Sequence, residues 1–388
     1  MRFYTHYTNY RHRECNCFLS RVAIAALAPR NDGEAASLVT RLALHFQRLA
    51  KTFILILALG YGNPLLAKEQ VLNLYIWGNY LPNEIIHQFT RETGIKVNLT
   101  EYDNNETMFA KIKVFKNPGY DVVAPSSYYV ERIIRHNMLH RLDKSKIPNL
   151  KHLLPELLNL PFDLKNLYSL PHVWGTTGII INKKYFPEPQ IEYWRDLWNP
   201  KYKDQLMLLN DMRDVFGIAL ISLGYSINDD NPQHIEEAYF KLKKLLPNVK
   251  IFSIDTVPNI YIDEDATIGM AWSGDANLAK EKNQDITYIY PRDGFSLWVD
   301  NLVIIKDAPH IENAHIFINY LLRPDIAKAV AISIGYATAN ATTMQMMHNN
   351  NIDGPIGDII KKGVIQLDLH DDIKHLYEKY WEKLKIDG

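Results

Sequence analysis

The stretch DGFSLWVDNLVII, residues 293–305, is predicted to form a strand, because aromatic, β-branched and apolar residues follow an opening Asp-Gly pair. Asp300 nevertheless stands in its middle, two residues after Trp298. Side chains alternate along a strand, so these two share one face of the sheet. A carboxylate on an apolar face is costly unless a cation or hydrogen-bond donors meet it. The stretch therefore predicts either a cationic ligand at Asp300 or a structural partner, such as backbone N–H groups or a buried arginine.

Strand and helix patterns alternate along the rest of the chain. The strand patterns cover residues 71–80, 95–102, 120–127, 178–182, 205–211 and 265–272, and the helical patterns cover 83–94, 105–115, 128–139 and 214–225. Ile85, Ile86 and Phe89, for example, recur at helical spacing before Gly94. This βαβ repetition indicates an α/β fold with a mostly parallel sheet and helices on both faces. Ligands of such sheets bind outside the carboxyl ends of the strands.

Two lobes are expected from the length and order of these elements. The chain has 388 residues, of which 47% are apolar and 22% charged, which is typical of a globular protein with two domains. No Gly/Ser-rich linker separates the two sets of strands and helices, which indicates that strands pass between the lobes. Residues 171–182 (PHVWGTTGIIIN) and 293–305 are the candidate crossings, with a ligand cleft beside them.

Charge and cysteine content narrow the class of partner. Residues 68–388 carry a net charge of −6, which argues against a nucleic acid as partner. Cys15 and Cys17 are the only cysteines in the sequence, and both precede residue 68. Neither a disulfide framework nor thiol chemistry is therefore expected in the main body of the protein.

Residues 1–67 are predicted to be an N-terminal extension followed by a signal peptide. Arg41, Arg48 and Lys51 precede the apolar run FILILALG (53–60), and Ala67 stands near a plausible cleavage point. The run is too short to cross a bilayer comfortably, so an uncleaved anchor is the less favoured alternative. The sequence therefore predicts export.

Motifs for catalysis and metal binding are missing from the sequence. It has no GxSxG elbow, no GxxxxGK[ST] phosphate loop and no HExxH. His136 and His140, four apart on a predicted helix, have no nearby acid and are interpreted as solvated helix residues. Without an activated nucleophile or a paired acid and base, an enzyme such as an amine hydrolase is not expected, nor is a cofactor or a metal.

The predicted strand ends instead carry aromatic residues and acids. They are Trp77, Tyr80, Ser126, Tyr128, Asp211, Asp214, Trp272, Trp298, Asp300 and Tyr336. Some of them have plain structural alternatives, because acids and serines cap helices and tryptophans often lie in the core. Together, however, aromatic faces that attract ammonium groups and carboxylates that bind them suit an organic cation with an alkyl body. A linear polyamine has this outline.

Longer strings strengthen that interpretation. QFTRETGIKV, NETMFAKIK, YDVVAPSSYYVER, DLWNPKYKDQL, LKKLLPNV, INYLLRPDIAKAVA and IGYATAN occur in one order between about Leu72 and Lys385. Through them the chain resembles the periplasmic spermidine/putrescine-binding proteins of bacterial polyamine ABC transporters. The resemblance implies the type II periplasmic-binding-protein fold, in which two α/β lobes close on a ligand about a hinge. It implies one lobe of residues 68–175 and 300–346 and another of 176–299 and 347–388.

The resemblance also implies roles for individual residues. The family's aromatic box falls on Trp77, Tyr80, Tyr128, Trp272, Trp298 and Tyr336, its amine-binding acids on Asp211, Asp214 and Asp300, and further contacts on Asn79, Ser126 and Gln366. Three positions depart from the family: Asn79 replaces an acid, Asp214 a glutamate and Ile254 a serine. The neutral Asn79 predicts lower affinity or a preference for a shorter diamine, so the choice between spermidine and putrescine stays open.

The partners follow from the same resemblance. It implies a monomeric periplasmic protein that captures a polyamine and delivers it to the permease subunits of an ABC transporter. Two alternatives stay open at this point. Adjacent Tyr128 and Tyr129 have the form of ferric-ion ligands, although three tryptophans do not suit an iron site. A polyamine sensor that signals through a membrane receptor would have the same sequence features.

Overall fold

The computed structural model describes residues 70–114, 119–187, 191–347 and 356–387. The predicted N-terminal extension and signal peptide, residues 1–67, lie outside the described residues. The strands are β1 (Val71–Trp77), β2 (Lys96–Tyr102), β3 (Val122–Val123), β4 (Leu139–His140), β5 (Ser169–Asn182), β6 (Leu206–Leu209), β7 (Val249–Ser253), β8 (Ile268–Trp272), β9 (Ile286–Ile289), β10 (Ser296–Ile305), β11 (Ala337–Thr338) and β12 (Val364–Ile365).

Helices connect these strands. They are α3 (Asn83–Thr93), α4 (Asn105–Val114), α5 (Ser127–Arg135), α6 (Met212–Leu223), α7 (Pro232–Lys243), α8 (Val257–Ile262), α9 (Ser273–Lys282), α10 (Ile311–Leu321), α11 (Pro324–Ile334), α12 (Ala341–Met346), α13 (Ile356–Lys362) and α14 (Asp371–Asp387). Short 3₁₀ helices lie at Lys144–Lys146, Pro148–His152, Pro155–Leu157, Leu164–Asn166, Trp194–Trp198, Pro200–Tyr202 and Leu246–Asn248.

The sheet is mixed and not mostly parallel. Its strands follow the order β2-β1-β3-β10-β5-β8-β6-β7. β1 pairs in parallel with β2 and β3, and β6 pairs in parallel with β7 and β8. β10 is antiparallel to β3 and β5, and β5 is antiparallel to β8. The prediction of a mostly parallel sheet is therefore wrong at the centre, where two long strands pair directly without a crossover helix between them.

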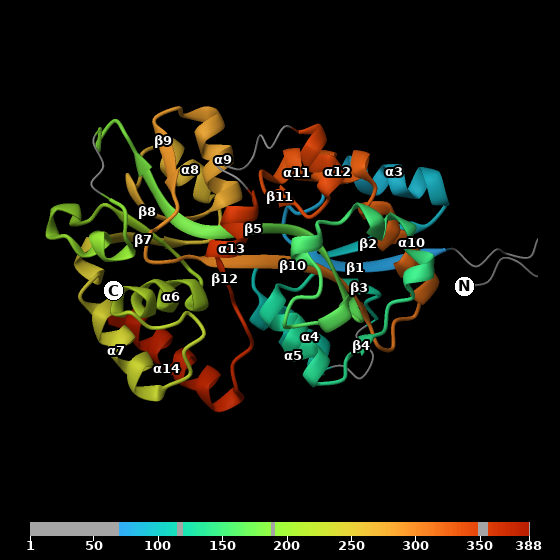
Figure 1. The fold of residues 1–388 in the computed structure, drawn as a ribbon, viewed down its shortest axis with the longest axis horizontal. Coiled ribbons are helices and arrows are strands. Elements are labelled where there is room, and N and C mark those ends of the chain that lie inside the picture. The colour runs from blue at the N-terminus through green and yellow to red at the C-terminus, as the bar shows by residue number, and fades with distance from the viewer. Residues whose placement is uncertain (1–69, 115–118, 188–190, 348–355, 388) are drawn as a thin grey trace, which may run out of the picture. The chain divides into compact units, whose positions relative to one another are not determined.

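β5 passes from one part of the sheet to the other, as predicted for residues 171–182 (Figure 1). Its first part, Ser169–Thr176, pairs with β10, and Thr177–Ile181 pairs with β8. All of its residues are buried, the polar ones included, as expected for a strand covered on both faces. The chain crosses between the two parts a second time after β9. β9 pairs with the C-terminal part of β5, and the next strand, β10, pairs with the N-terminal part of β5.

Two hydrophobic cores lie on the two sides of this crossing. The first contains buried residues of β1, β3, β10, α3, α5, α10 and α11. The second contains buried residues of β6, β8, α6, α7, α9 and α14. Figure 1 shows the two groups of helices around the two ends of β5. Contact clusters of this kind usually mark one core per domain, which agrees with two lobes.

The helix boundaries follow local chemistry. α3 ends where Gly94 adopts a left-handed conformation (φ 73°) that glycine tolerates well. α5 ends at Arg135, before the predicted position, because the chain turns at His136 and Asn137 (φ 56°) and continues into β4. His136 and His140 therefore do not lie on one helix, and the interpretation of them as a helical pair is wrong.

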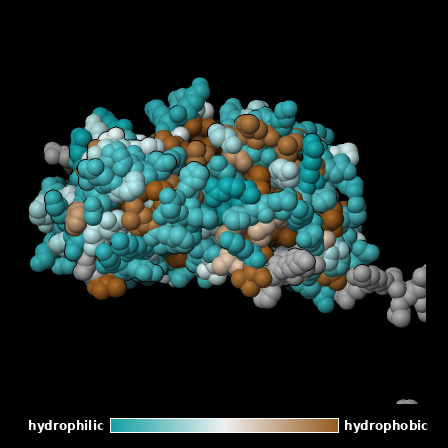
Figure 2. Space-filling model, turned by 90° about the horizontal axis from the view of Figure 1, so that it is seen from below, coloured by the Kyte–Doolittle hydropathy of each residue, from teal (hydrophilic) through white to brown (hydrophobic). Residues whose placement is uncertain are grey.

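The surface is mostly polar. Figure 2 shows one face, on which hydrophilic residues predominate and hydrophobic residues form small groups. Within the described ranges, no helix has the length and hydrophobicity needed to cross a membrane.

Candidate functional site

A cavity of about 460 Å³ lies where strand ends and helix starts of the two cores face each other. All twelve residues predicted to bind ligand line it. Trp77, Asn79, Tyr80, Ser126, Tyr128, Trp298, Asp300 and Tyr336 come from elements of the first core, and Asp211, Asp214 and Trp272 come from the second. Gln366 enters from the segment between β12 and α14. Residues far apart in the sequence thus converge on one volume.

Asp300 is 3% exposed and is met by hydroxyl groups. Tyr80 donates its O–H to Asp300 Oδ2, and Ser126 Oγ donates to Asp300 Oδ1 at 2.6 Å. Neither structural partner considered for it, a backbone N–H or an arginine, bonds to the carboxylate in the described residues. Burial raises the pKa of Asp300 to about 6, although the two hydroxyl donors oppose this shift. Within the part of the chain that the structure describes, Asp300 is thus held by neutral donors, and no cationic side chain bonds to it.

Ser126 does not cap α5 with its side chain, contrary to one of the structural alternatives. It occupies the N-cap position, but its hydroxyl is committed to Asp300. Asn105 Nδ2 donates to Ser126 Oγ and to Tyr128 Oη, at 3.1 Å in each case. Asn105 also lines the cavity. It orients two predicted ligand contacts and was not identified from the sequence.

Asp211 and Asp214 form the acidic end of the cavity on the second core. Asp211 caps α6, since its Oδ1 accepts the backbone N–H of Asp214 at 2.9 Å. The structural alternative for Asp211 is therefore confirmed, and it coexists with a place in the cavity wall. Burial raises the pKa of Asp211, and the charge of Asp214 adds to this shift.

Asp214 is 5% exposed and accepts three side-chain hydrogen bonds. Thr177 Oγ1 and Trp272 Nε1 donate to its Oδ2 at 2.9 and 2.8 Å, and Gln366 Nε2 donates to its Oδ1 at 2.9 Å. These donors come from β5, β8 and the C-terminal segment. Burial still raises the pKa of Asp214, and the donors moderate the shift.

Aromatic rings in contact with one another form part of the cavity lining. The ring of Trp298 meets Tyr336 edge-on, with centroids 5.1 Å apart. The Tyr336 and Tyr80 centroids are 6.0 Å apart, and those of Tyr80 and Trp77 are 6.2 Å apart. Contiguous rings of this kind can cover methylene groups and attract an ammonium group.

Three further aspartates line the cavity and were not identified from the sequence. They are Asp103, Asp255 and Asp275. Asp275 stands three residues after Trp272 and receives a hydrogen bond from Tyr336 Oη at 3.3 Å. Burial raises its pKa to about 7, against the effect of that hydrogen bond. Asp275 ends the string AWSGD, but an acid in the first turn of a helix is common for reasons of helix stability and does not by itself indicate a binding site.

The lining contains six aspartates and, among the described residues, no lysine, arginine or histidine. A lining with this charge favours a cationic ligand, although the buried guanidinium of Arg213, outside the lining, lowers the pKa values of Asp211 and Asp214 to some extent. Asn79 lines it in a left-handed conformation (φ 61°) that asparagine tolerates, and its backbone N–H donates to Glu101 Oε1 at 2.9 Å. The neutral side chain leaves the rim near Asp103 with one carboxylate fewer than the family pattern predicts.

The site does not resemble an iron centre. The described ranges contain no cluster of histidine, cysteine, aspartate and glutamate that could hold a metal ion. Of the adjacent tyrosines, Tyr128 lines the cavity, whereas Tyr129 donates to Glu106 Oε1 at 3.2 Å and is not part of the lining. The ferric-ion alternative is therefore not favoured.

Two lobes, a strand that crosses between them and a cavity with ligand-binding chemistry define a solute-binding protein, and the predicted type II periplasmic-binding-protein fold is confirmed. The chain belongs to the family of bacterial extracellular solute-binding proteins, whose model matches residues 84–348. It is 42% identical over 333 residues to the spermidine/putrescine-binding periplasmic protein of Salmonella typhimurium, covering 85% of this chain and 95% of that protein. It is 39% identical to spermidine/putrescine-binding periplasmic protein 1 of Haemophilus influenzae, covering 82% and 90%.

Solved structures agree with this assignment. The spermidine/putrescine ABC transporter substrate-binding protein PotD from Streptococcus pneumoniae matches with a TM-score of 0.71 and 35% identity. The match covers 82% of this chain and 99% of that chain.

Proposed function

We propose that this protein binds a linear polyamine of the spermidine/putrescine class in the cavity and delivers it to the permease of an ABC transporter. The observation that carries the proposal is the cavity lining, with six aspartates, no basic side chain among the described residues, and a wall of aromatic rings. The names of the relatives support the same ligand class. Their periplasmic location supports export of this chain as well.

The twelve predicted contacts have distinct roles in this proposal. Asp300 binds one amine together with the oxygens of Tyr80 and Ser126, and Asp211 with Asp214 binds another. Gln366 holds Asp214, and the rings listed above cover the methylene groups between the amines. Asn79 and Asp103 stand at the rim, where a neutral side chain reduces the attraction for a further amine.

We also infer that the protein closes about its ligand through two lobes, residues 68–175 with 300–346 and residues 176–299 with 347–388. The two hydrophobic cores support this division in outline. β10 packs along its whole length in the first core, and Ile359 and Ile365 pack there as well. In this proposal the lobe boundaries therefore lie near residues 290–295 and after β12, and not at residues 300 and 347. The protein acts as a monomer in this proposal, which light scattering during size-exclusion chromatography would test.

The protein binds its ligand without turnover in this proposal. No histidine, cysteine or lysine lines the described cavity, so an activated nucleophile is not at hand. Intact recovery of the bound amine, measured by mass spectrometry after prolonged incubation, is the expected result, and a stoichiometric product would contradict it.

The decisive experiment is calorimetric titration of the purified protein after unfolding, dialysis and refolding to remove bound ligand. Spermidine, putrescine and spermine are titrated in turn, with ferric citrate as a control. One saturable site for a polyamine and none for ferric citrate is the expected result. Absence of polyamine binding by protein with a cooperative thermal transition would overturn the proposal.

Transport and sensing are separated by reconstitution. If the protein delivers polyamine to a permease, its addition to proteoliposomes that contain the permease and ATPase should stimulate uptake of labelled polyamine. Tight binding without stimulated uptake or ATP hydrolysis would instead favour the sensor.

A further inference from the structure

The segment of residues 365–371 connects the two hydrophobic cores. It follows β12, which pairs with β10 beside the first core, and it leads into α14, which packs against α6 and α7 in the second. Polar groups bond to its backbone at successive positions. These bonds are Asn228 Nδ2 to Ile365 O, Ser127 Oγ to Gln366 O, Leu367 N to Asn228 Oδ1, and Arg213 Nη1 to Leu367 O. These hydrogen bonds fix the backbone of the segment relative to both cores.

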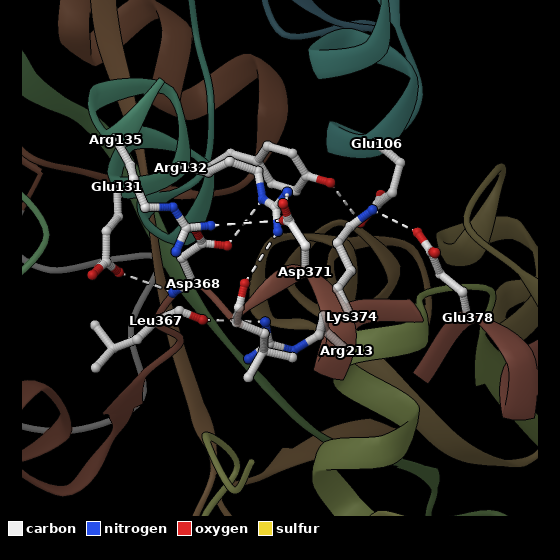
Figure 3. A network of polar contacts seen from close by, with 12 residues as sticks. Glu106, Glu131, Arg132, Arg135, Arg213, Leu367, Asp368, Asp371, Lys374 and Glu378 are labelled. Carbon is white, nitrogen blue, oxygen red and sulfur yellow. Dashed lines mark hydrogen bonds and ion pairs between the residues drawn. The ribbon is translucent and has the colours of Figure 1, made fainter. Parts of the chain in front are cut away.

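Arg132 of α5 is at the centre of this network (Figure 3). Its Nε lies 3.0 Å from Asp368 Oδ1, its Nη1 lies 2.7 Å from Asp371 Oδ1, and its Nη2 donates to Leu369 O at 3.1 Å. The side chains of Arg132 and Asp368 are 6% and 4% exposed. α5 packs in the first core and Leu369 in the second, so these bonds join the two cores.

Two neighbours of Arg132 on the same helix also hold Asp368. Arg135 Nη2 forms an ion pair with Asp368 Oδ2 at 2.6 Å, and Glu131 Oε2 accepts the backbone N–H of Asp368 at 2.9 Å. Asp368 is thus bound through both carboxylate oxygens and through its backbone by one helix (Figure 3). Removal of Arg132 would leave the buried Asp368 carboxylate with only the more exposed Arg135 as an ion-pair partner in the described residues.

The same elements reach the ligand cavity. α5 presents Tyr128 to the cavity at its N-terminal end, and Asp368 stands two residues after Gln366, which bonds to Asp214. Movement of the segment away from α5 would therefore displace Gln366 from the acidic end of the site. Neither Arg132 nor Asp368 lines the cavity itself.

We propose that Arg132 and Asp368 form a lock between the two lobes that holds the cleft closed and fixes Gln366 against Asp214. Polyamine affinity then depends on Arg132 as a positioning residue, although it does not touch the ligand. The inference rests on the proposed polyamine-binding function. Arginine suits this place because its planar fork reaches three acceptors at once, which a lysine ammonium group cannot do in the same geometry.

The test uses the purified protein and three variants. R132M keeps the aliphatic length and removes the fork, R132K keeps a cation, and the double variant R132M/D368L removes both buried charges. Spermidine affinity is measured by calorimetry, thermal stability by circular dichroism, and the radius of gyration by small-angle X-ray scattering with and without spermidine. We expect both single variants to bind about tenfold more weakly, a coupling typical of residues in one network.

The double variant separates positioning from folding. In R132M the buried Asp368 carboxylate keeps only Arg135 as an ion-pair partner, and the double variant removes that carboxylate. The double variant should therefore regain thermal stability relative to R132M, but its affinity should stay low and its ligand-free radius of gyration should exceed that of the wild type. If R132M does not fold, R132K and the double variant decide the matter by the same measurements.

R323M is the matched control. Arg323 forms ion pairs with Glu92 and with Asp325, at 2.6 Å for the latter, and all three residues belong to elements of the first core. Its loss should leave affinity and radius of gyration unchanged. Wild-type affinity in R132M and the double variant, or an equal loss in R323M, would overturn the lock. Failure of the wild type itself to bind spermidine would instead refute the function on which it rests.

Discussion

At the scale of single residues, Asp300 is the most informative position. Its carboxylate is buried and satisfied by the hydroxyls of Tyr80 and Ser126, yet burial keeps its pKa at about 6. An ammonium group in the cavity would compensate this charge. Asp300→Asn should therefore weaken polyamine binding by about 1.5–3 kcal/mol, the range for a hydrogen bond to a charged group.

Calorimetry of D300N checks this prediction, with Asp307→Asn as the control because Asp307 is exposed and follows β10 closely. Unchanged affinity in D300N would remove Asp300 from the binding site. A large loss of thermal stability at unchanged affinity would assign it a structural role.

Asp275 is one of the lining residues that the sequence did not indicate. Its carboxyl lines the cavity beside Tyr336, and burial raises its pKa to about 7. Asp275→Asn should weaken binding at pH 8, where the aspartate is ionised, and should change affinity much less at pH 5.5. Calorimetry at the two pH values checks this, and an equal loss at both would show that the variant acts through its shape alone.

The sequence predicts a site residue best where the residue has no common structural role in its element. Asp300 stands out because an acid is unusual on a buried strand, and Trp298 because it shares a face of that strand with Asp300; both line the cavity. The sequence does not indicate Asp275 and Asn105 as site residues because an acid or asparagine in the first turn of a helix is common. Asp211 shows that one carboxylate can serve as a helix cap and still face the cavity.

At the scale of elements, the pairing of β5 with β10 places the tryptophan wall. Trp298 lies opposite Gly175 in the antiparallel register, and a Cβ added to Gly175 would lie 2.4 Å from the Trp298 ring. Glycine is therefore required there to let the ring cross the neighbouring strand. Gly175→Ala should displace Trp298, weaken polyamine binding and cost about 1–3 kcal/mol of stability through overpacking.

Tryptophan fluorescence, thermal unfolding and calorimetry together check the Gly175 prediction. Gly357→Ala is the control, because an added Cβ at that helical glycine has no atom within 4 Å. It should stabilise the protein slightly, by about 0.4–1 kcal/mol, at unchanged affinity. Equal behaviour of the two variants would show that Gly175 has no special role.

Strand and helix patterns identified most of the elements but not the direction of the central strands. Periodicity reports which face of an element is buried, and β5 and β10 are buried on all sides. Whether such a strand pairs in parallel or antiparallel depends on contacts between residues more than a hundred positions apart, as in the pairing of Trp298 with Gly175. Local sequence does not contain this information.

At the scale of the whole molecule, the buried carboxyls link binding to pH. The pKa values of Asp300 and Asp275 are raised to about 6 and about 7 in the ligand-free protein. A bound cation stabilises their ionised forms, so binding releases protons. Affinity should therefore fall as the pH is lowered from about 8 to about 5, by up to tenfold per pH unit for each group that must be ionised.

The stability of the ligand-free protein should change in the opposite direction. Carboxyls with raised pKa values bind more protons in the folded state than in the unfolded state, where the pKa is about 3.9. Their contribution to stability is complete below that value and is lost as the pH rises through about 6 and about 7. Thermal unfolding with and without spermidine between pH 5 and pH 8 checks both trends. A stabilisation by ligand that does not grow with pH would contradict them.

The hydrogen bonds around Asp300 and Asp214 have a consequence for selectivity. Tyr80 and Ser126 both donate their hydroxyl protons to Asp300, so their oxygens can only accept hydrogen bonds from a ligand. The N–H groups of Trp272 and Gln366 are likewise directed at Asp214. The groups bonded to Asp300 and Asp214 therefore present mainly acceptors to the cavity, although the indole N–H groups of Trp77 and Trp298 have no partner among the described residues. Each ammonium group of a diamine can donate three hydrogen bonds to these acceptors. Each hydroxyl of a diol of the same length can donate only one, so some acceptors would face lone pairs of the ligand. We therefore expect the protein to prefer a diamine to a diol of the same length because the diamine donates more hydrogen bonds.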